Sequence, residues 1–135
     1  MRQATVRRER SADWSPPLHE LPAVLEFGPR RRDRAGWCLL RFVAAARGVP
    51  TRQLLASSRG EADVAQARHL AMYLMHVVLG RLYLDVGRFF GRDRTTVSYA
   101  CALIEDMRDD AEFDAEVSRL ERRLAMRREI KHAHA

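Results

Sequence analysis

One stretch of the chain, residues 65–104, constrains the fold more than any other. In its first part, apolar side chains recur at helical spacing, which predicts a helix over residues 65–79 with one apolar face. Gly80 follows, and glycine readily adopts the left-handed conformation that ends many helices. The apolar face is formed by Ala67, Leu70, Ala71, Leu74, Val77 and Val78.

Two further helices are expected after this glycine. Residues 84–90 predict a short helix that ends at Gly91, with Val86 and either Phe89 or Phe90 turned inward. Asp93 occupies an N-cap position, and residues 95 to about 107 predict a third helix. A short helix, a tight turn and a longer helix with small polar residues at its start form a helix-turn-helix, whose second helix enters the DNA major groove. The inward residues of the third helix are Val97, Ala100, Cys101, Ile104 and Met107.

Two motifs in this stretch resemble a known family. Residues 67–74 read ARHLAMYL, and residues 91–105 read GRDRTTVSYACALIE. The C-terminal DNA-binding domain (domain IV) of the bacterial replication initiator DnaA typically reads AR(Q/H)xAMYL and then GGRDHTTV, and the resemblance covers roughly residues 36–124. It implies an all-α, Trp-repressor-like helix-turn-helix fold of about five to six helices. Because the chain contains no G-x-x-x-x-G-K-[ST] phosphate loop, we expect a stand-alone DNA-binding domain with no nucleotide and no cofactor.

The resemblance also implies a set of DNA-contacting residues. Arg68 and His69 match positions that contact phosphate in the family, although His69 can equally be an ordinary exposed helix residue. Arg59 lies in a loop that is basic in the family and reaches the minor groove. Here the loop reads SSRGEAD, so Arg59 is either a minor-groove contact or a solvated residue. The other expected contacts belong to the helix-turn-helix: Leu84, Arg92, Asp93, Arg94, Thr95, Thr96, Ser98 and Tyr99.

Several of these residues depart from the family pattern. Leu84 stands where the family usually has proline, Arg94 and Tyr99 each replace a histidine, and one glycine is missing from the turn. Asp93 is expected to cap the third helix and, by the resemblance, to accept a hydrogen bond from a base amine. We therefore expect the docking mode to be retained while the base preference shifts, with Arg94 favouring a guanine.

The charge distribution points to the same region. The chain of 135 residues carries 24 basic and 18 acidic residues, a net charge of +6. Residues 37–104 hold nine arginines against four acids, whereas residues 105–135 hold seven bases against nine acids. The positive excess thus coincides with the predicted helix-turn-helix, and double-stranded DNA is the expected partner.

The chain divides into three predicted regions. Residues 1–34 form an irregular Arg- and Pro-rich arm that either lies along phosphates or is a solvated tail. Residues 35–128 form the helical domain, and residues 129–135 a frayed tail. Within the domain, further helices are expected over residues 37–47, 51–55 and 112 to about 128. The last of these either packs on the core or offers a short apolar seam to a weak homodimer or protein partner. The inward face of the first is assigned to Trp37, Leu40, Val43 and Ala44.

The remaining chemistry is sparse. Cys38 and Cys101 both fall on predicted apolar helix faces and are expected to be buried, reduced thiols. Neither a nucleophile–base pair nor metal-ligand spacing occurs, so we expect no enzymatic activity and no bound metal. No apolar run has the length of a signal peptide or a membrane span, which predicts a cytoplasmic protein without membrane contact.

Two functions are compatible with these patterns. The first is sequence-specific binding of double-stranded DNA at sites that resemble DnaA boxes, which would regulate replication initiation or transcription. The alternative is a protein-interaction module that kept the fold but lost specific DNA reading. The loop with a single arginine and the altered positions Arg94 and Tyr99 are the support for this alternative.

Overall fold

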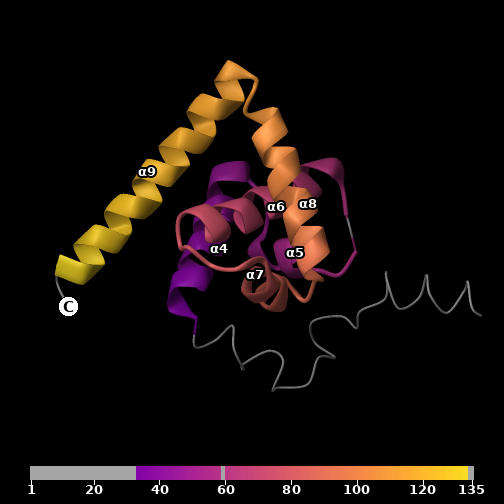
Figure 1. Cartoon of the computed structure of the whole chain (residues 1–135), viewed down its shortest axis with the longest axis horizontal. Coiled ribbons are helices and arrows are strands. Elements are labelled where there is room, and N and C mark those ends of the chain that lie inside the picture. The colour runs from indigo at the N-terminus through magenta and orange to yellow at the C-terminus, as the bar shows by residue number, and fades with distance from the viewer. Residues whose placement is uncertain (1–32, 59, 134–135) are drawn as a thin grey trace, which may run out of the picture.

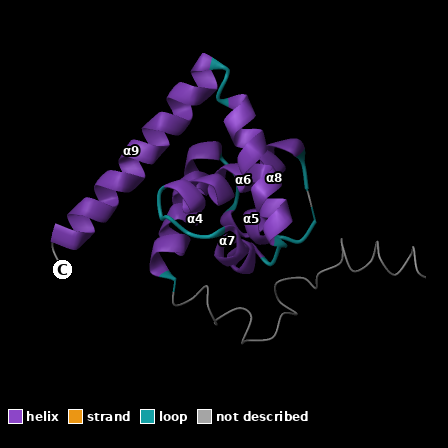
Figure 2. Ribbon diagram, viewed as in Figure 1, coloured by secondary structure: helices purple, strands orange, loops and turns teal. Residues whose placement is uncertain are grey.

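Six helices make up the part of the chain that the structure, a computed structural model, describes, namely residues 33–58 and 60–133 (Figures 1 and 2). No strand occurs within these ranges, so the all-α prediction is confirmed. The predicted arm lies outside the described residues except for its last two, Asp33 and Arg34. The helices are α4 (Arg34–Arg47), α5 (Thr51–Leu55), α6 (Ala62–Val77), α7 (Tyr83–Phe90), α8 (Arg94–Met107) and α9 (Ala111–Ala133).

Helix α6 lies at the centre of the domain. It packs against α4, α5, α7 and α8, so its side chains are buried on most of its circumference rather than on the single face that the sequence predicted. Leu70, Leu74 and Met75 are completely buried. Val77 was predicted to be buried as well but is 41% exposed. It is the last residue of α6, where the surrounding helices no longer cover the surface.

Helix α4 begins earlier than expected because Asp33 caps it. The backbone N–H of Gly36 donates to the Asp33 carboxylate at 2.9 Å, and the helix starts at Arg34 rather than Trp37. The same carboxylate accepts from the Arg81 guanidinium, which lies between α6 and α7. Burial raises the pKa of Asp33, but these bonds outweigh it and lower the pKa below its ordinary value. The bonds between Asp33 and Arg81 therefore connect the start of α4 to the segment that precedes α7.

The inward face of α4 differs in part from the prediction. Leu40, Val43 and Ala44 are buried as expected, and Leu39 is buried with them. Trp37 is only half-buried and packs edge-on against Phe89 of α7, with ring centroids 6.4 Å apart.

The prediction that both cysteines are buried is wrong for one of them. Cys38 is exposed, because its position on α4 faces away from the buried side formed by Leu39, Leu40 and Val43. Cys101 of α8 is buried, and burial raises the pKa of its thiol to about 11, so the thiol stays protonated at neutral pH.

The corner between α8 and α9 is organised by Arg108. Its guanidinium donates to the Asp114 carboxylate at 2.6 Å, the Tyr73 hydroxyl at 3.0 Å and the Ser118 hydroxyl at 3.0 Å. It also forms an ion pair with Glu121 at 3.1 Å. This single side chain therefore connects the end of α8 to the first turns of α9 and to α6.

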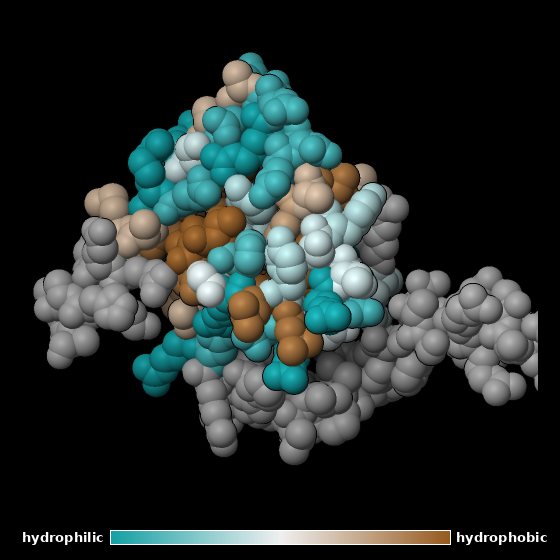
Figure 3. All heavy atoms as spheres, in the orientation of Figure 1, coloured by the Kyte–Doolittle hydropathy of each residue, from teal (hydrophilic) through white to brown (hydrophobic). Residues whose placement is uncertain are grey.

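The apolar face of helix α9 packs against the core of the same chain. Val117, Leu120 and Leu124 are buried in the same cluster as the residues of α4, α6 and α8. Arg127 lies 5.4 Å over the Phe42 ring of α4. In Figure 3 the outer surface of α9 is mostly hydrophilic. The predicted alternatives for this helix were core packing and a pairing seam, and the structure has core packing. The helix continues to Ala133, through most of the tail that was expected to be frayed.

Candidate nucleic-acid interface

Helices α7 and α8 meet at a tight turn. The turn needs Gly91, whose φ of 68° places it in the left-handed region, where side chains bring strain. The backbone N–H of Arg92 donates to the carbonyl of Gly87 at 2.8 Å and closes the turn. Gly87 allows this approach, because a Cβ there would lie closer than 3.0 Å to the Arg92 carbonyl oxygen. Val86 is buried as predicted. Phe89 and Phe90 are both buried, whereas the sequence had predicted that one of the two would be turned inward.

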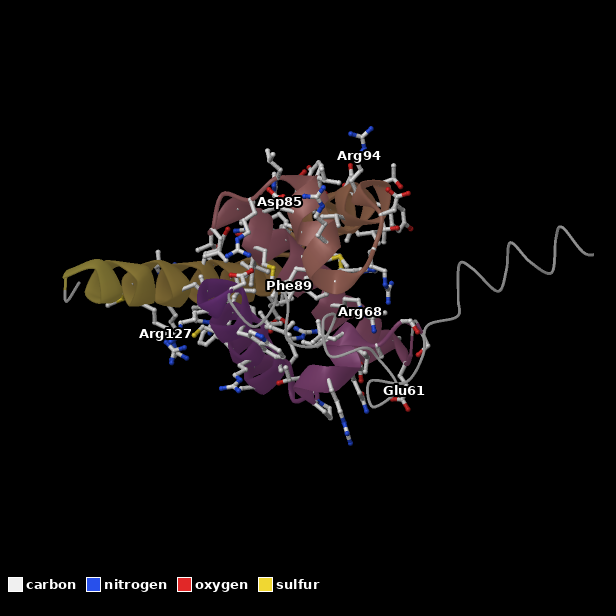
Figure 4. The ribbon with its side chains drawn as sticks, turned by 90° about the horizontal axis from the view of Figure 1, so that it is seen from below. Glu61, Arg68, Asp85, Phe89, Arg94 and Arg127 are labelled. Atoms are coloured by element: carbon white, nitrogen blue, oxygen red, sulfur yellow. The ribbon has the colours of Figure 1, made fainter. Side chains whose placement is uncertain are left out.

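Helix α8 separates a buried face from an exposed one. Val97, Ala100, Cys101 and Ile104 are buried as predicted, whereas Met107 is half-buried. Thr96 is half-exposed, and Tyr99 is 63% exposed. Figure 4 shows the labelled Arg94 projecting away from the helices. The structure thus places most of the predicted recognition residues on one accessible surface at the start of α8. The exposed members of that surface are Arg94, Thr95, Ser98 and Tyr99.

Asp93 holds the N-cap position but does not act through its side chain. Its backbone carbonyl accepts from the N–H groups of Thr96 at 3.0 Å and Val97 at 3.3 Å. The carboxylate makes no capping hydrogen bond, so the predicted side-chain cap is wrong. The backbone has the extended conformation of a cap, with φ −70° and ψ 150°, and the carboxylate remains at the surface.

The start of α7 lies next to this surface. Leu84 is 47% exposed, and Figure 4 places Asp85 of α7 on the same side of the molecule as Arg94. Leu82, which directly precedes α7, is 68% exposed and was not among the predicted site residues. The exposure of Leu82 and Leu84 could have been predicted from the sequence. Both leucines flank Tyr83, and neither belongs to the inward-facing set of Val86, Phe89 and Phe90.

Arg68 does not lie on the surface. It is only 2% exposed, and its guanidinium donates to the backbone carbonyls of Leu54 at 2.9 Å, Gln53 at 2.9 Å and Ser58 at 3.2 Å. Burial, followed by repulsion from Arg92, lowers the pKa of Arg68 to about 10. The expected phosphate contact does not fit this geometry, because α6 is enclosed by its neighbours and directs the side chain toward the loop after α5. His69, the next residue, is half-exposed.

Arg92 likewise bonds within the chain. Its guanidinium donates to the backbone carbonyls of Ala56 at 2.8 Å and Ser57 at 3.0 Å, and the residue is half-exposed. Partial burial lowers the pKa of Arg92 below its ordinary value. Arg59 lies outside the described residues.

The described residues offer little other chemistry. They contain no group of three or more His, Cys, Asp or Glu side chains placed to hold a metal ion. None of the helices from α4 to α9 is both long enough and apolar enough to cross a membrane.

A short helix, a glycine turn and a second helix with an exposed polar surface at its start define a helix-turn-helix DNA-binding domain. Residues 38–104 match the family model described as bacterial dnaA protein helix-turn-helix. This domain of the chain belongs to the bacterial DnaA helix-turn-helix family, and the predicted resemblance is confirmed.

Chromosomal replication initiator proteins DnaA are similar to the chain. That of Chloroflexus aggregans is 34% identical over 101 residues, which are 73% of this chain and 21% of the initiator. That of Deinococcus radiodurans is 36% identical over 99 residues, again 73% and 21% of the two chains. That of Sphingopyxis alaskensis is 40% identical over 72 residues, or 52% and 16%. The chain therefore spans about a fifth or less of the length of these relatives.

A solved structure supports the fold. The replication initiator DnaA bound to AMPPCP and single-stranded DNA superimposes with a TM-score of 0.64 and 24% sequence identity. The alignment covers 92% of this chain and 36% of that chain. The family consists of helix-turn-helix DNA-binding domains, not of catalytic domains.

Proposed function

We propose that this protein binds double-stranded DNA sequence-specifically, at sites that resemble DnaA boxes, and regulates replication initiation or transcription by occupying them. The single observation that carries the proposal is the surface at the start of α8. Arg94, Thr95 and Ser98 are exposed on a helix whose opposite face is fully buried, so the helix is rigidly held while its polar groups face outward. A helix of about 10–12 Å diameter fits the major groove, which is about 12 Å wide.

Each exposed group has a plausible partner in the groove. The Arg94 guanidinium can donate two parallel hydrogen bonds to guanine, worth about 1–3 kcal/mol against a wrong base. The Thr95 and Thr96 hydroxyls can bond phosphate, and their methyl groups can contact the methyl group of thymine. The Asp93 carboxylate, which makes no capping bond, remains able to accept from a base amine. Tyr99 and Leu84 add exposed apolar surface beside these polar groups.

The test is fluorescence anisotropy with a duplex that carries a DnaA box and a duplex of scrambled sequence, each at two salt concentrations. Tighter binding to the box duplex that persists at the higher salt supports the proposal. Equal binding to both duplexes that collapses with salt indicates phosphate attraction alone. That outcome overturns the proposal and favours the alternative of a protein-interaction module.

Two variants locate the contact. Arg94→Ala should weaken binding to the box duplex and relax the preference at one base position, and Thr96→Ala should weaken specific binding. The matched control is Arg119→Ala, an exposed arginine on α9, which should bind like the parent. Figure 1 shows why: α9 starts at the opposite end of α8 from Arg94. If both site variants bind like the parent, the assignment of α8 as the recognition helix is wrong.

A further inference from the structure

We propose that Arg68 and Arg92 are positioning residues that hold residues 53–58 against the start of α8, so that this loop and the recognition helix form one surface toward DNA. The inference rests on the proposed function. It replaces the expected roles of both residues, because it assigns their effect on DNA binding to the loop rather than to direct contacts with DNA.

The first part of the evidence is that the two guanidinium groups share one short segment. Arg68, on α6, donates to the carbonyls of Gln53, Leu54 and Ser58. Arg92 donates to the carbonyls of Ala56 and Ser57, which lie between them. Five backbone carbonyls within six residues therefore accept hydrogen bonds from only two side chains.

This segment needs such donors. Helix α5 has only five residues, Thr51–Leu55. The Gln53 carbonyl accepts from the Ala56 N–H at 3.3 Å, whereas the Leu54 carbonyl has no partner from a continuing helix. The segment then runs in extended backbone at Ala56, with φ −66° and ψ 147°, and Ser57 and Ser58 are not helical. Guanidinium groups suit this task, because each presents five N–H donors in a fixed fork and charge-assisted hydrogen bonds are stronger than neutral ones.

Arg92 makes the connection to the recognition helix. Its backbone N–H bonds to Gly87 inside the turn, and it directly precedes the N-cap residue of α8. Its side chain reaches residues that precede it in the chain by 36 and 35 positions. The loop and the start of α8 therefore cannot move apart without breaking these bonds.

The arrangement also keeps two positive charges close together. Repulsion from Arg92 contributes to the lowered pKa of Arg68, after burial. Two like charges are not brought together in a partly buried site unless other interactions compensate. The five carbonyl dipoles provide such compensation, which explains why both guanidinium groups bond within the chain although both residues were expected to contact DNA.

The test uses amide hydrogen exchange of the free protein together with the salt dependence of duplex binding. Arg92→Ala should speed exchange across residues 53–58 by about tenfold or more, while the core of α6 and α8 exchanges as in the parent. It should weaken binding to the box duplex by about tenfold without lowering the salt slope. Arg92→Lys, which keeps the charge but loses the fork, should fall between Arg92→Ala and the parent in both measurements.

Two control variants separate positioning from other effects. Arg94→Ala removes an exposed arginine that is proposed to contact a base, so it should relax the preference at one base position and leave loop exchange unchanged. Val117→Ala destabilises the core from α9, away from the helix-turn-helix and the loop, so it should raise exchange throughout and leave the affinity of the folded protein unchanged.

Two results overturn the inference. One is unchanged exchange of residues 53–58 in Arg92→Ala. The other is a salt slope that falls by about 0.9 in Arg92→Ala and is restored by Arg92→Lys, which identifies a direct phosphate contact. If the parent protein binds no duplex at all, the proposed function fails instead, and the exchange experiment still reports whether the arginines hold the loop.

Discussion

Arginine side chains have two distinct roles in this domain, and burial separates them. Arg94 is exposed at the start of α8, whereas Arg68 is enclosed and bonded to three backbone carbonyls. Arg108 connects the last two helices and α6. The net charge therefore counts each of these arginines equally, although they do not all face outward.

The buried position of Arg68 leads to a prediction about stability. Arg68→Ala should lower the free energy of unfolding by about 3 kcal/mol or more, because it removes the donor to the buried Leu54 carbonyl and creates a cavity. Urea unfolding monitored by circular dichroism measures this. The control is Arg52→Ala, an exposed arginine on the neighbouring helix α5, which should change stability by no more than about 0.5 kcal/mol. Equal effects of the two substitutions would show that Arg68 is not a structural residue.

At the scale of elements, the close approach of α7 and α8 is the feature that positions the recognition surface. The turn has few residues and depends on two glycines for different reasons. Gly91 adopts a left-handed conformation, and Gly87 leaves room for the backbone of Arg92. The start of α8 is therefore fixed relative to α7 by these backbone contacts together with the packing of their buried side chains.

Adding one methyl group at this contact should disturb DNA binding. Gly87→Ala should lower the free energy of unfolding by about 1–3 kcal/mol, since the new Cβ overlaps the Arg92 carbonyl oxygen and the turn must open. Binding to the box duplex should weaken with it, as measured by anisotropy below the unfolding temperature. Ala115→Gly on α9 is the matched control. It should cost about 1 kcal/mol through helix propensity and leave DNA binding intact. Unchanged binding in Gly87→Ala would mean that the turn geometry does not control recognition.

At the scale of the whole molecule, α6 is the shared support of the other helices, and α9 completes the core. The apolar side of α9 is buried against the chain itself, with Arg47 of α4 paired to Glu116 of α9 at 2.7 Å. The polar outer side of this helix faces away from the body of the domain (Figure 3). The C-terminal helix is thus a structural part of the domain as far as Arg127, the last residue with a described side chain.

A core substitution in α9 tests this role. Leu120→Ala should lower the free energy of unfolding by about 2–5 kcal/mol, because it leaves a cavity beneath the helix. Met126→Ala, at a position that is 59% exposed, should change it by no more than about 0.5 kcal/mol. Chemical denaturation of both variants gives the comparison. If Leu120→Ala is as mild as Met126→Ala, α9 does not belong to the core and its apolar side is open to another partner.

Much of the fold could be predicted because its signals are local. The period of apolar residues located α6, α7 and α8 to within three residues at each end, and Gly91 marked the turn. Exposure of Thr95 and Tyr99 followed from the same periodicity, since both fall opposite Val97 and Cys101. Arg94 shares the side of Val97 and Cys101 by period, and it is exposed at the first residue of the helix. The missing side-chain cap at Asp93 could not be predicted, because a cap position is recognised by residue type while its hydrogen bond depends on the rotamer.

The sequence by itself therefore determined the order of the helices, the helix-turn-helix and the polar surface of its second helix, since each depends on residues within a few turns of one another. Only the tertiary structure decided the direction of Arg68 and the covering of α9. Each of these depends on which distant segments meet: α6 with the loop after α5, and α4 with α9. Whether a residue is buried depends on which elements pack around it, so the apolar period of a single helix does not by itself predict burial.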